Sequence, residues 1–469
     1  MKQLKLLLAV TLLCSSCFSQ TKSFIQLDSI FTLLHGQNQF NGEVFIAERG
    51  KIIFNKGYGF ANEETKSRIN GKTIFELASC SKQFTGAAIV LLKREGKVNY
   101  TDKLSKYIPE LKFWEDVTIY DLLRHTSGIP DFIFSMDNNW DPQKIASNDD
   151  VITFYSSRKD TLEFKPKTAH RYSNTNYVLL ASIIERVSGK KYGEYLADNI
   201  FKPLGMNNTF VYNRRKKAKK IENYAIGYVW AYNSFTKVTM ENPEYNEQRV
   251  YYLDGVEGAA KVNSCAEDIY KWILALHSNT LLSQREFEEM TEITQTTAGS
   301  PIPYGFGLDL RKSENKMAFG HTGSWDGYST LIYHDSIKDR TIIILENFNQ
   351  GANAVTNVFE ILDGRPLTME YEKKIDIEEP IFIQFTGTYA DEEGNEHIIT
   401  YKDKHLIYNS NVAQWDMRFF PYAKNEFFAI RQGGRNGVLR FSKLDNGDIK
   451  LEMLEYGSLI GQGTRRNKS

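Results

Sequence analysis

The chain has 469 residues, 41% of them hydrophobic, so it is long enough for two domains and apolar enough for each to bury a core. Lysine plus arginine number 58, as do aspartate plus glutamate, which gives a formal net charge of zero at pH 7. This balance argues against a nucleic-acid partner and against electrostatic attraction to an anionic membrane.

The N-terminus has the pattern of an export signal. The basic start Met1–Lys5 precedes an apolar run over residues 6–13, which is too short to span a bilayer. We expect cleavage after Ser19 and export to the periplasm or the medium. A lipid-modified Cys17 is the alternative, and only such an anchor would attach the protein to a membrane.

The mature chain opens with strand signals and continues into an apolar helix. Short apolar segments at 43–47 and 52–54 flank a polar turn and predict a β-hairpin. Residues 79–92 are apolar almost all round, and basic residues and then Gly96 follow them. This pattern predicts a buried helix that ends at the glycine.

The middle of the chain is predicted to be mostly helical. Helical patterns occur at 177–187 and 266–276, whereas 328–333 and 340–345 have the pattern of paired strands. Strands therefore lie at both ends of a helical middle. The charged segment 366–380 lacks clear periodicity and is predicted to be a linker.

The C-terminal part differs in character. Residues 385–463 consist of short aromatic and β-branched runs separated by turn signals such as Asn446-Gly447. This spacing predicts an antiparallel barrel or sandwich.

One pair of residues at a helix start could carry chemistry. Ser79 and Lys82 lie three residues apart, so both project from the same face of the first helical turn. A serine hydroxyl needs a nearby base, and a desolvated lysine at a helix N-terminus can have its pKa lowered enough to serve. The positive end of the helix dipole also favours an oxyanion.

Five ordered motifs then carry a resemblance. The chain resembles the serine β-lactamase and penicillin-binding protein superfamily, in its class C-like branch of D-alanyl-D-alanine carboxypeptidases, D-aminopeptidases and esterases. The resemblance covers about residues 25–365. The motifs are Phe75-Glu76-Leu77-Ala78-Ser79-Cys80-Ser81-Lys82, Leu122-Leu123-Arg124-His125-Thr126-Ser127-Gly128, Tyr172-Ser173-Asn174, Pro203-Leu204-Gly205-Met206 and His321-Thr322-Gly323.

The resemblance implies roles for the residues at the helix start and the second loop. Ser79 would be acylated and Lys82 would share its proton. Tyr172 would act as base or proton relay, and Asn174 would orient Lys82 and the substrate amide.

It also implies that one strand lines the cleft opposite the helix. His321, Thr322 and Gly323 would form this strand, with backbone N–H groups of Ser79 and Ser324 as the oxyanion hole. Glycine at 323 would let the substrate approach closely. Relatives usually have lysine where this chain has His321, so we expect weaker recognition of a carboxylate.

The implied fold is an α/β fold of the α+β type, with an antiparallel sheet flanked by helices and a helical subdomain. Residues 385–389 resemble the start of a lipocalin-like β-domain, which implies an eight-stranded barrel. The predicted domains are a signal peptide at 1–19, a hydrolase domain at 20–365, a linker at 366–380 and a β-barrel domain at 381–469.

The predicted function is a serine hydrolase that acts outside the cytoplasm on small amides, peptides or esters. D-amino-acid peptides are the leading substrate class, so the expected partner is a small molecule or short peptide. An esterase of the same superfamily and a catalytically silent cell-wall or β-lactam binding protein are the alternatives. An α/β-hydrolase is disfavoured because the sequence contains no Gly-x-Ser-x-Gly elbow. Metal-ligand spacing is absent too, so neither metal nor cofactor is expected.

Several other residues have simpler interpretations. His125 is expected to make structural hydrogen bonds, and the basic run 214–220 to be a solvated loop rather than a site for an anionic polymer. Trp325 either lines the substrate cleft or packs in the core. Cys80 and Cys265 are expected to be buried free thiols rather than a disulfide.

Overall fold

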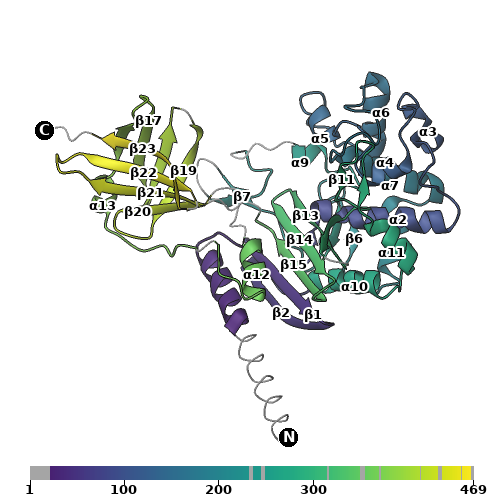
Figure 1. Cartoon of the computed structure of the whole chain (residues 1–469), viewed down its shortest axis with the longest axis horizontal. Coiled ribbons are helices and arrows are strands. Elements are labelled where there is room, and N and C mark those ends of the chain that lie inside the picture. Colours follow the sequence, from purple (N-terminus) through teal and green to yellow (C-terminus); the bar gives the residue numbers. More distant parts are fainter. Residues whose placement is uncertain are drawn as a thin grey trace, which may run out of the picture. The chain divides into compact units, whose positions relative to one another are not determined.

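The computed structural model describes residues 22–231, 236–243, 249–313, 316–348, 354–368, 371–411, 413–430, 436–455 and 457–465. The chain forms two compact units. Gly42–Asn349 forms the sheet-and-helix unit, and Met1–Asn41 together with Gln350–Ser469 forms the barrel unit. Both are visible in Figure 1, in which the barrel strands are yellow-green. The predicted signal, including its cleavage site and Cys17, lies outside the described residues.

A six-stranded antiparallel sheet organises the sheet-and-helix unit. Its strand order is β12-β13-β14-β15-β1-β2. The predicted hairpin is confirmed, with positive φ at both Arg49 and Gly50 in its turn. The strands are β1 (Gly42–Glu48), β2 (Lys51–Tyr58), β12 (Asp309–Ser313), β13 (Lys316–Trp325), β14 (Tyr328–Asp335) and β15 (Arg340–Glu346).

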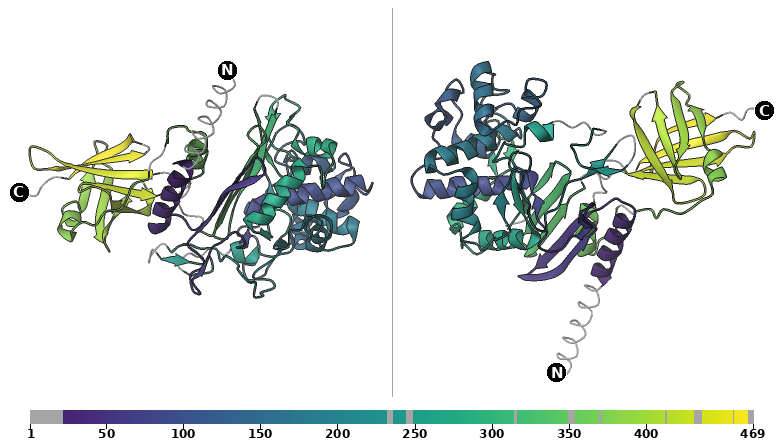
Figure 2. Two further views of the ribbon diagram at one scale, coloured as in Figure 1. Left: turned by 90° about the horizontal axis from the view of Figure 1, so that it is seen from below. Right: turned by 180° about the vertical axis from the view of Figure 1, so that it is seen from behind.

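Three helices of this unit are long, namely α2 (Lys82–Arg94), α7 (Asn174–Ser188) and α10 (Ala266–His277). Helix α10 contacts β15 of the sheet, while α2 and α7 contact each other. The predicted buried helix is α2, which is buried from Lys82 to Leu92 and begins three residues later than predicted. A short 3₁₀ turn, η1 (Ala78–Ser81), precedes it. Viewed with the sheet edge-on, the helices of this unit lie on one side of it (Figure 2, left).

Shorter elements complete the unit. The helices are α3 (Leu104–Tyr107), η2 (Pro109–Leu111), α4 (Ile119–Leu123), α5 (Phe132–Ser135), α6 (Asn148–Arg158), α8 (Tyr192–Leu196), η3 (Ala197–Phe201), α9 (Arg249–Tyr252) and α11 (Gln284–Thr291). The strands are β3 (Phe60–Asn62), β4 (Ser67–Arg68), β5 (Phe75–Glu76), β6 (Phe210–Val211), β7 (Val229–Trp230), β8 (Lys237–Val238), β9 (Val262–Ser264), β10 (Thr294–Gln295) and β11 (Pro301–Ile302). The predicted fold, an antiparallel sheet flanked by helices with a helical part, is confirmed.

The barrel unit contains a closed eight-stranded antiparallel barrel. This confirms the barrel and excludes the sandwich. Its core is aromatic, with Tyr389, Phe427 and Phe441 each at most 1% exposed. The strands are β16 (Gly387–Ala390), β17 (Glu396–Lys402), β18 (His405–Ser410), β19 (Ala413–Pro421), β20 (Glu426–Ile430), β21 (Asn436–Lys443), β22 (Ile449–Glu455) and β23 (Ser458–Arg465).

The remaining elements of the barrel unit are helical. Residues 22–36, α12 (Val355–Leu362) and α13 (Glu379–Ile383) are helices. The described part of the predicted linker lacks regular structure until α13 begins, and the amide of Ile375 donates to the carbonyl of Pro421 on the barrel. The predicted domain boundaries stay predictions. None of the helices in the described ranges is long and apolar enough to cross a bilayer.

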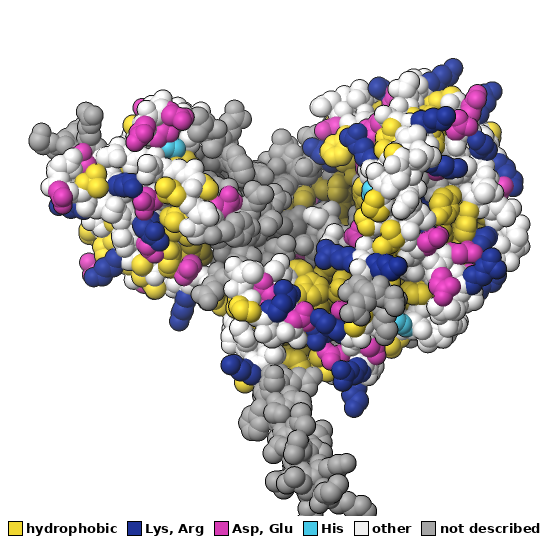
Figure 3. Space-filling model, in the orientation of Figure 1, with side chains coloured by type: hydrophobic (Ala, Val, Ile, Leu, Met, Phe, Trp, Pro, Cys, Tyr) yellow, Lys and Arg dark blue, Asp and Glu magenta, His cyan; other side chains and the backbone are white. Residues whose placement is uncertain are grey.

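The surface charges match the balanced composition. On the face drawn in Figure 3, lysine and arginine side chains are interspersed with aspartate and glutamate over the described parts of both units. A mixed surface of this kind sets up no large field of one sign.

Candidate active site

Ser79 stands at the entry to α2 in a constrained turn. Its preceding residue, Ala78, has φ +48°, in the left-handed region that a residue with a side chain rarely adopts. The turn is held on both sides by β9, because Leu77 N–H donates to the carbonyl of Val262 and Val262 N–H donates to Ser81 Oγ. Neighbouring strand pairing therefore fixes the backbone that presents Ser79.

Lys82 is the buried partner of this serine. Its side chain is 0% exposed, and Nζ donates to Ser79 Oγ at 3.0 Å, to Asn174 Oδ1 at 2.8 Å and to the carbonyl of Ala259 at 2.8 Å. Burial lowers the pKa of Lys82 to about 7, although the charge of Asp131 opposes the shift. Once Nζ loses one proton, two N–H groups suffice for Asn174 and Ala259, and its lone pair can accept the Ser79 hydroxyl.

Asn174, the first residue of α7, is oriented by a carboxylate. Asp131 Oδ2 accepts from Asn174 Nδ2 at 2.8 Å and from Asn174 N–H at 2.9 Å. The other oxygen of Asp131 caps the start of α5 by accepting from Ile133 N–H. These bonds turn the amide oxygen of Asn174 toward Lys82, so the side chain has one available orientation.

Tyr172 lies over the ammonium group of Lys82. Its ring centroid is 4.9 Å from Lys82 Nζ, and its side chain lies beside Ser79. Although 36% of the residue is exposed, protein atoms crowd the hydroxyl, and this burial raises the pKa of Tyr172 well above its ordinary value, only partly offset by Ser79. The phenol is therefore protonated at neutral pH. It can relay a proton more readily than it can act as the initial base.

His125 packs against the ring of Tyr172. The two ring centroids are 4.3 Å apart, and His125 Nδ1 accepts from Ser173 N–H at 3.2 Å. The residue is 0% exposed, and burial holds the pKa of His125 well below its ordinary value. These contacts are structural, as the sequence indicated.

Strand β13 lies alongside the serine turn. Cys80 Sγ donates to the carbonyl of His321 at 3.1 Å, and a Cβ added at Gly323 would lie 2.4 Å from the carbonyl oxygen of Leu77. Glycine at 323 thus has a packing reason, since the backbone before Ser79 passes directly over it. Within the described residues β12 pairs with β13 only up to Gly320, so the stretch from His321 onward has an open edge there.

The side chains of the predicted strand motif alternate between two faces. His321 and Gly323 are buried, whereas Thr322 and Ser324 are exposed. The structure thus brings the backbone of this motif to the serine turn, but places the Thr322 and Ser324 side chains on the opposite face from Gly323. Trp325 is partly buried and packs against the core, in agreement with its packing interpretation.

His321 is held in its neutral form. Its Nε2 lies 3.0 Å from the hydroxyl of Tyr304, and its Nδ1 contacts the carbonyl of Thr322. Burial and the positive charge of Lys82 lower the pKa of His321 to about 3. The residue therefore supplies no cation at neutral pH.

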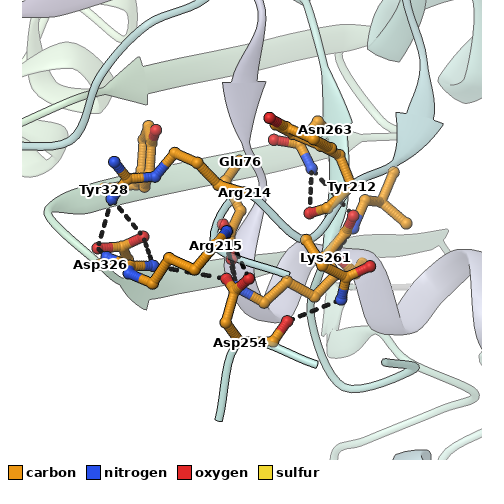
Figure 4. A network of polar contacts seen from close by, with 12 residues as sticks. Glu76, Tyr212, Arg214, Arg215, Asp254, Lys261, Asn263, Asp326 and Tyr328 are labelled. Carbon is orange, nitrogen blue, oxygen red and sulfur yellow. Dashed lines mark hydrogen bonds and ion pairs between the residues drawn. The ribbon is translucent and has the colours of Figure 1, made fainter. Parts of the chain in front are cut away.

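A buried network of charges adjoins the site and anchors its walls (Figure 4). Lys261 Nζ pairs with Asp254 at 3.0 Å and with Glu76 at 3.3 Å. Arg215 pairs with Asp254 at 3.4 Å and with Asp326 at 2.6 Å. Glu76 precedes the serine turn and Asp326 follows β13, while Lys261 is two residues beyond Ala259, which accepts from Lys82. The network therefore ties together three segments that line the site.

Part of the basic run was misinterpreted as solvated. The Arg215 side chain is 6% exposed and that of Arg214 19%, because both pair with Asp326. Residues 216–220 are exposed, as predicted. The pairing acids lie far along the chain, so the local pattern of charges could not show them.

Sequence reasoning missed three residues that shape the site. Asp131, Ala259 and Tyr304 position Asn174, Lys82 and His321, respectively. Asp131 had a usable signal, because an aspartate after Gly-Ile-Pro is a typical N-cap. Ala259 acts through its carbonyl and has no sequence signal.

The cysteines and the metal-ligating residues add no further group to the site. Cys80 and Cys265 are buried free thiols, as expected, and burial raises the pKa of each to about 12. Throughout the described ranges, histidine, cysteine, aspartate and glutamate form no cluster of three that could hold a metal ion.

Comparison with known proteins identifies a family and relatives of this chain. Residues 27–363 match the family Beta-lactamase. Penicillin-binding protein 4* of Bacillus subtilis (strain 168) is 35% identical over 411 residues, covering 86% of this chain and 90% of that protein.

Solved structures are similar as well. D-amino acid amidase from Ochrobactrum anthropi SV3, solved with D-phenylalanine, is 25% identical with a TM-score of 0.58, covering 72% of this chain and 98% of that one. The octameric penicillin-binding protein homologue from Pyrococcus abyssi shares the fold, with a TM-score of 0.63 and 24% identity over 91% of this chain and 97% of that one.

The charge network yields a stability prediction. Lys261→Met leaves two buried carboxylates without their shared cation, so the free energy of unfolding should fall by about 3–5 kcal/mol. Urea denaturation followed by tryptophan fluorescence measures the change. Lys217→Met, at an exposed position of the basic run, is the matched control and should change it by less than about 0.5 kcal/mol. Equal stability of the two variants would contradict the structural role of the network.

Proposed function

Because the chain belongs to the β-lactamase and penicillin-binding protein superfamily of serine hydrolases, we propose that it forms an acyl-enzyme on Ser79 and hydrolyses small amides, peptides or esters outside the cytoplasm. D-amino-acid peptides are the leading substrate class. The observation that carries the proposal is the buried amine of Lys82 at 3.0 Å from Ser79 Oγ, with its pKa lowered to about 7.

Acylation begins with proton transfer from Ser79 to neutral Lys82. Ser79 Oγ then attacks the substrate carbonyl carbon, and the resulting oxyanion accepts from the backbone N–H groups of Ser79 and Ser324. The positive end of the α2 dipole adds to this stabilisation. Tyr172, whose ring lies over Lys82 Nζ, relays the proton from Lys82 to the leaving group as the carbonyl re-forms. Water then releases the acyl group with the same groups in reverse roles.

Substrates without a free carboxylate suit the cleft best. Neutral His321 cannot form an ion pair with a substrate carboxylate. One of the similar solved structures is a D-amino acid amidase. The amide of an amino acid, unlike the free amino acid, has no carboxylate. Small amides and esters of D-amino acids, and D-peptides cleaved from the amino end, are therefore the preferred candidates.

An esterase of the same superfamily is the second candidate, since the chemistry on Ser79 would be identical. A catalytically silent binding protein is disfavoured, because Ser79, Lys82 and Asn174 retain a complete set of hydrogen bonds for proton transfer. The proposed mechanism requires neither metal nor cofactor. Export to the periplasm or the medium, with membrane attachment only through a lipidated Cys17, completes the proposal.

Removal of the nucleophile gives the first test. Ser79→Ala should lower turnover of a chromogenic ester by about three orders of magnitude or more and abolish labelling by a fluorescent serine probe. Ser156→Ala is the control, because Ser156 also precedes a lysine by three residues but lies on the surface of α6. A folded Ser79→Ala protein with full activity would rule out the assignment.

The pKa of Lys82 gives a pH prediction. The acylation rate should rise with pH through about 7, because Lys82 must lose a proton to act as base. Asp131 raises the pKa of Lys82, so Asp131→Asn should move this limb to lower pH. The amide has one acceptor oxygen, so if it caps α5 it no longer orients Asn174, and the plateau rate should fall as well. Stopped-flow measurement of the acylation rate from about pH 5 to about pH 9, roughly two units on either side of the pKa, gives the position of this limb. A limb displaced to higher pH would contradict the role of Lys82.

The strand histidine gives a specificity prediction. His321→Lys should raise kcat/KM for a substrate with a free carboxylate relative to its matched amide, by about tenfold, since an ion pair replaces a neutral contact. His321→Gln is the neutral control. If the wild-type protein already prefers the substrate with the carboxylate and His321→Lys does not increase that preference, another cation binds the carboxylate and the prediction is wrong.

A further inference from the structure

One end of the barrel is filled and the other is hollow. At the filled end Phe382 and Phe385 enter the core, and the ring of Phe385 stacks on Phe441 with centroids 4.4 Å apart. At the other end lies a cavity of about 500 Å³, bounded by the β16–β17 loop and by β21, β22 and β23. This volume is in the range of small-molecule sites.

The sequence of β23 explains why the cavity is open. Gly461 and Gly463 are successive positions on the same face of the strand, and a Cβ at either would point at barrel side chains. At Gly461 it would lie 2.4 Å from Met453 Cε, and at Gly463 3.2 Å from His397 Cδ2. Strand β23 therefore supplies backbone rather than side chains where it passes Met453 and His397.

One residue that lines this cavity has a buried polar atom without a hydrogen-bond partner among the described residues. His397 is 5% exposed and lines the cavity, and its Nδ1 lies 3.0 Å from the hydroxyl of Tyr408. Its Nε2 is buried and makes no hydrogen bond within the described residues. The nearest carboxylate oxygen, Asp391 Oδ2, is 3.8 Å away, which is beyond hydrogen-bond distance. A buried polar atom of this kind costs free energy unless a ligand or water satisfies it.

The charged residues among the described residues that line the cavity are all acidic. Asp391, Glu392 and Glu393 line it, and none of its described lining residues is lysine or arginine. Asp391 is fixed in place, because Oδ1 accepts from the amides of Glu393 and Asn395 and Oδ2 accepts from Asn395 Nδ2. The Asn395 bonds lower the pKa of Asp391, so the group is ionised at neutral pH.

The walls below this polar group are apolar. Phe419, Leu439 and Met453 line the cavity and belong to, or pack against, the barrel core. A ligand must therefore combine an apolar body with a polar group that reaches both His397 Nε2 and Asp391 Oδ2. A primary ammonium does so, since it can donate one hydrogen to the carboxylate and another to the imidazole when Nδ1–H donates to Tyr408.

We propose that this end of the barrel is a binding site for a small apolar primary amine, with the ammonium group held between Asp391 and His397. The site is independent of the chemistry proposed for Ser79. It gives the C-terminal domain a ligand of defined class, a cation with an aromatic or aliphatic body of up to drug-like size.

The experiment uses the full chain and three matched probes: 2-phenylethylamine, 2-phenylethanol and phenylacetate. Isothermal titration calorimetry measures affinity, and the ¹³C-methyl NMR signal of Met453, assigned with Met453→Leu, locates binding. We expect the amine to bind at least tenfold more tightly than the alcohol or the carboxylate and to shift the Met453 signal. A preference for the carboxylate, or amine binding that leaves the Met453 signal in place, would overturn the proposal.

Variants separate this site from the serine cleft. Asp391→Asn keeps an acceptor for the Asn395 amide but removes the charge, so affinity for the amine should fall at least tenfold while turnover of a neutral ester is unchanged. Glu396→Gln is the control, because Glu396 is an exposed residue at the start of β17 that does not line the cavity. Unchanged amine affinity in a folded Asp391→Asn protein, or an equal loss in Glu396→Gln, would refute the site.

Discussion

The structure around the cleft depends on the burial of one amine. Lys82 loses its contact with water and receives three oxygen partners, none of them a carboxylate. Hydrogen bonds to neutral oxygens replace part of the hydration of an ammonium but not its counter-charge, so the protonated form is disfavoured. The rest of the site maintains this condition. Asn174 is held by Asp131, and Ala259 is held by the segment that the charge network anchors.

Two buried lysines among the described residues of this unit show how environment separates function from structure. Lys261 is as buried as Lys82, but two carboxylates lie within 3.3 Å and the pKa of Lys261 is raised despite its burial. Lys261 thus stays charged and acts as a fixed cross-link, whereas Lys82 can exchange a proton near neutral pH. The two lysines serve different purposes because Lys261 contacts carboxylates and Lys82 does not.

The sequence was sufficient where chemistry is local. The serine and lysine at a helix start, the hairpin around residues 49–50 and the buried helix were predicted from short-range patterns. For the C-terminal part such patterns left a barrel or a sandwich, and the resemblance to a lipocalin-like domain implied the barrel. It was insufficient where a partner is distant. Arg215 was predicted to be solvated because Asp254 and Asp326 lie 39 and 111 residues away. Gly323 was explained by substrate approach, whereas its contact with Leu77 comes from the packing of two remote segments.

The topology of the central sheet affects the order in which the chain can fold. Strand β1 lies between β2 and β15 in the sheet. Gly42, the first residue of the sheet-and-helix unit, pairs with Glu346, which is close to the end of that unit in the sequence. During synthesis β1 can form its hairpin early, but one of its edges has no partner until β15 has emerged. Such late, long-range pairing slows folding and leaves an apolar edge open to aggregation in the meantime.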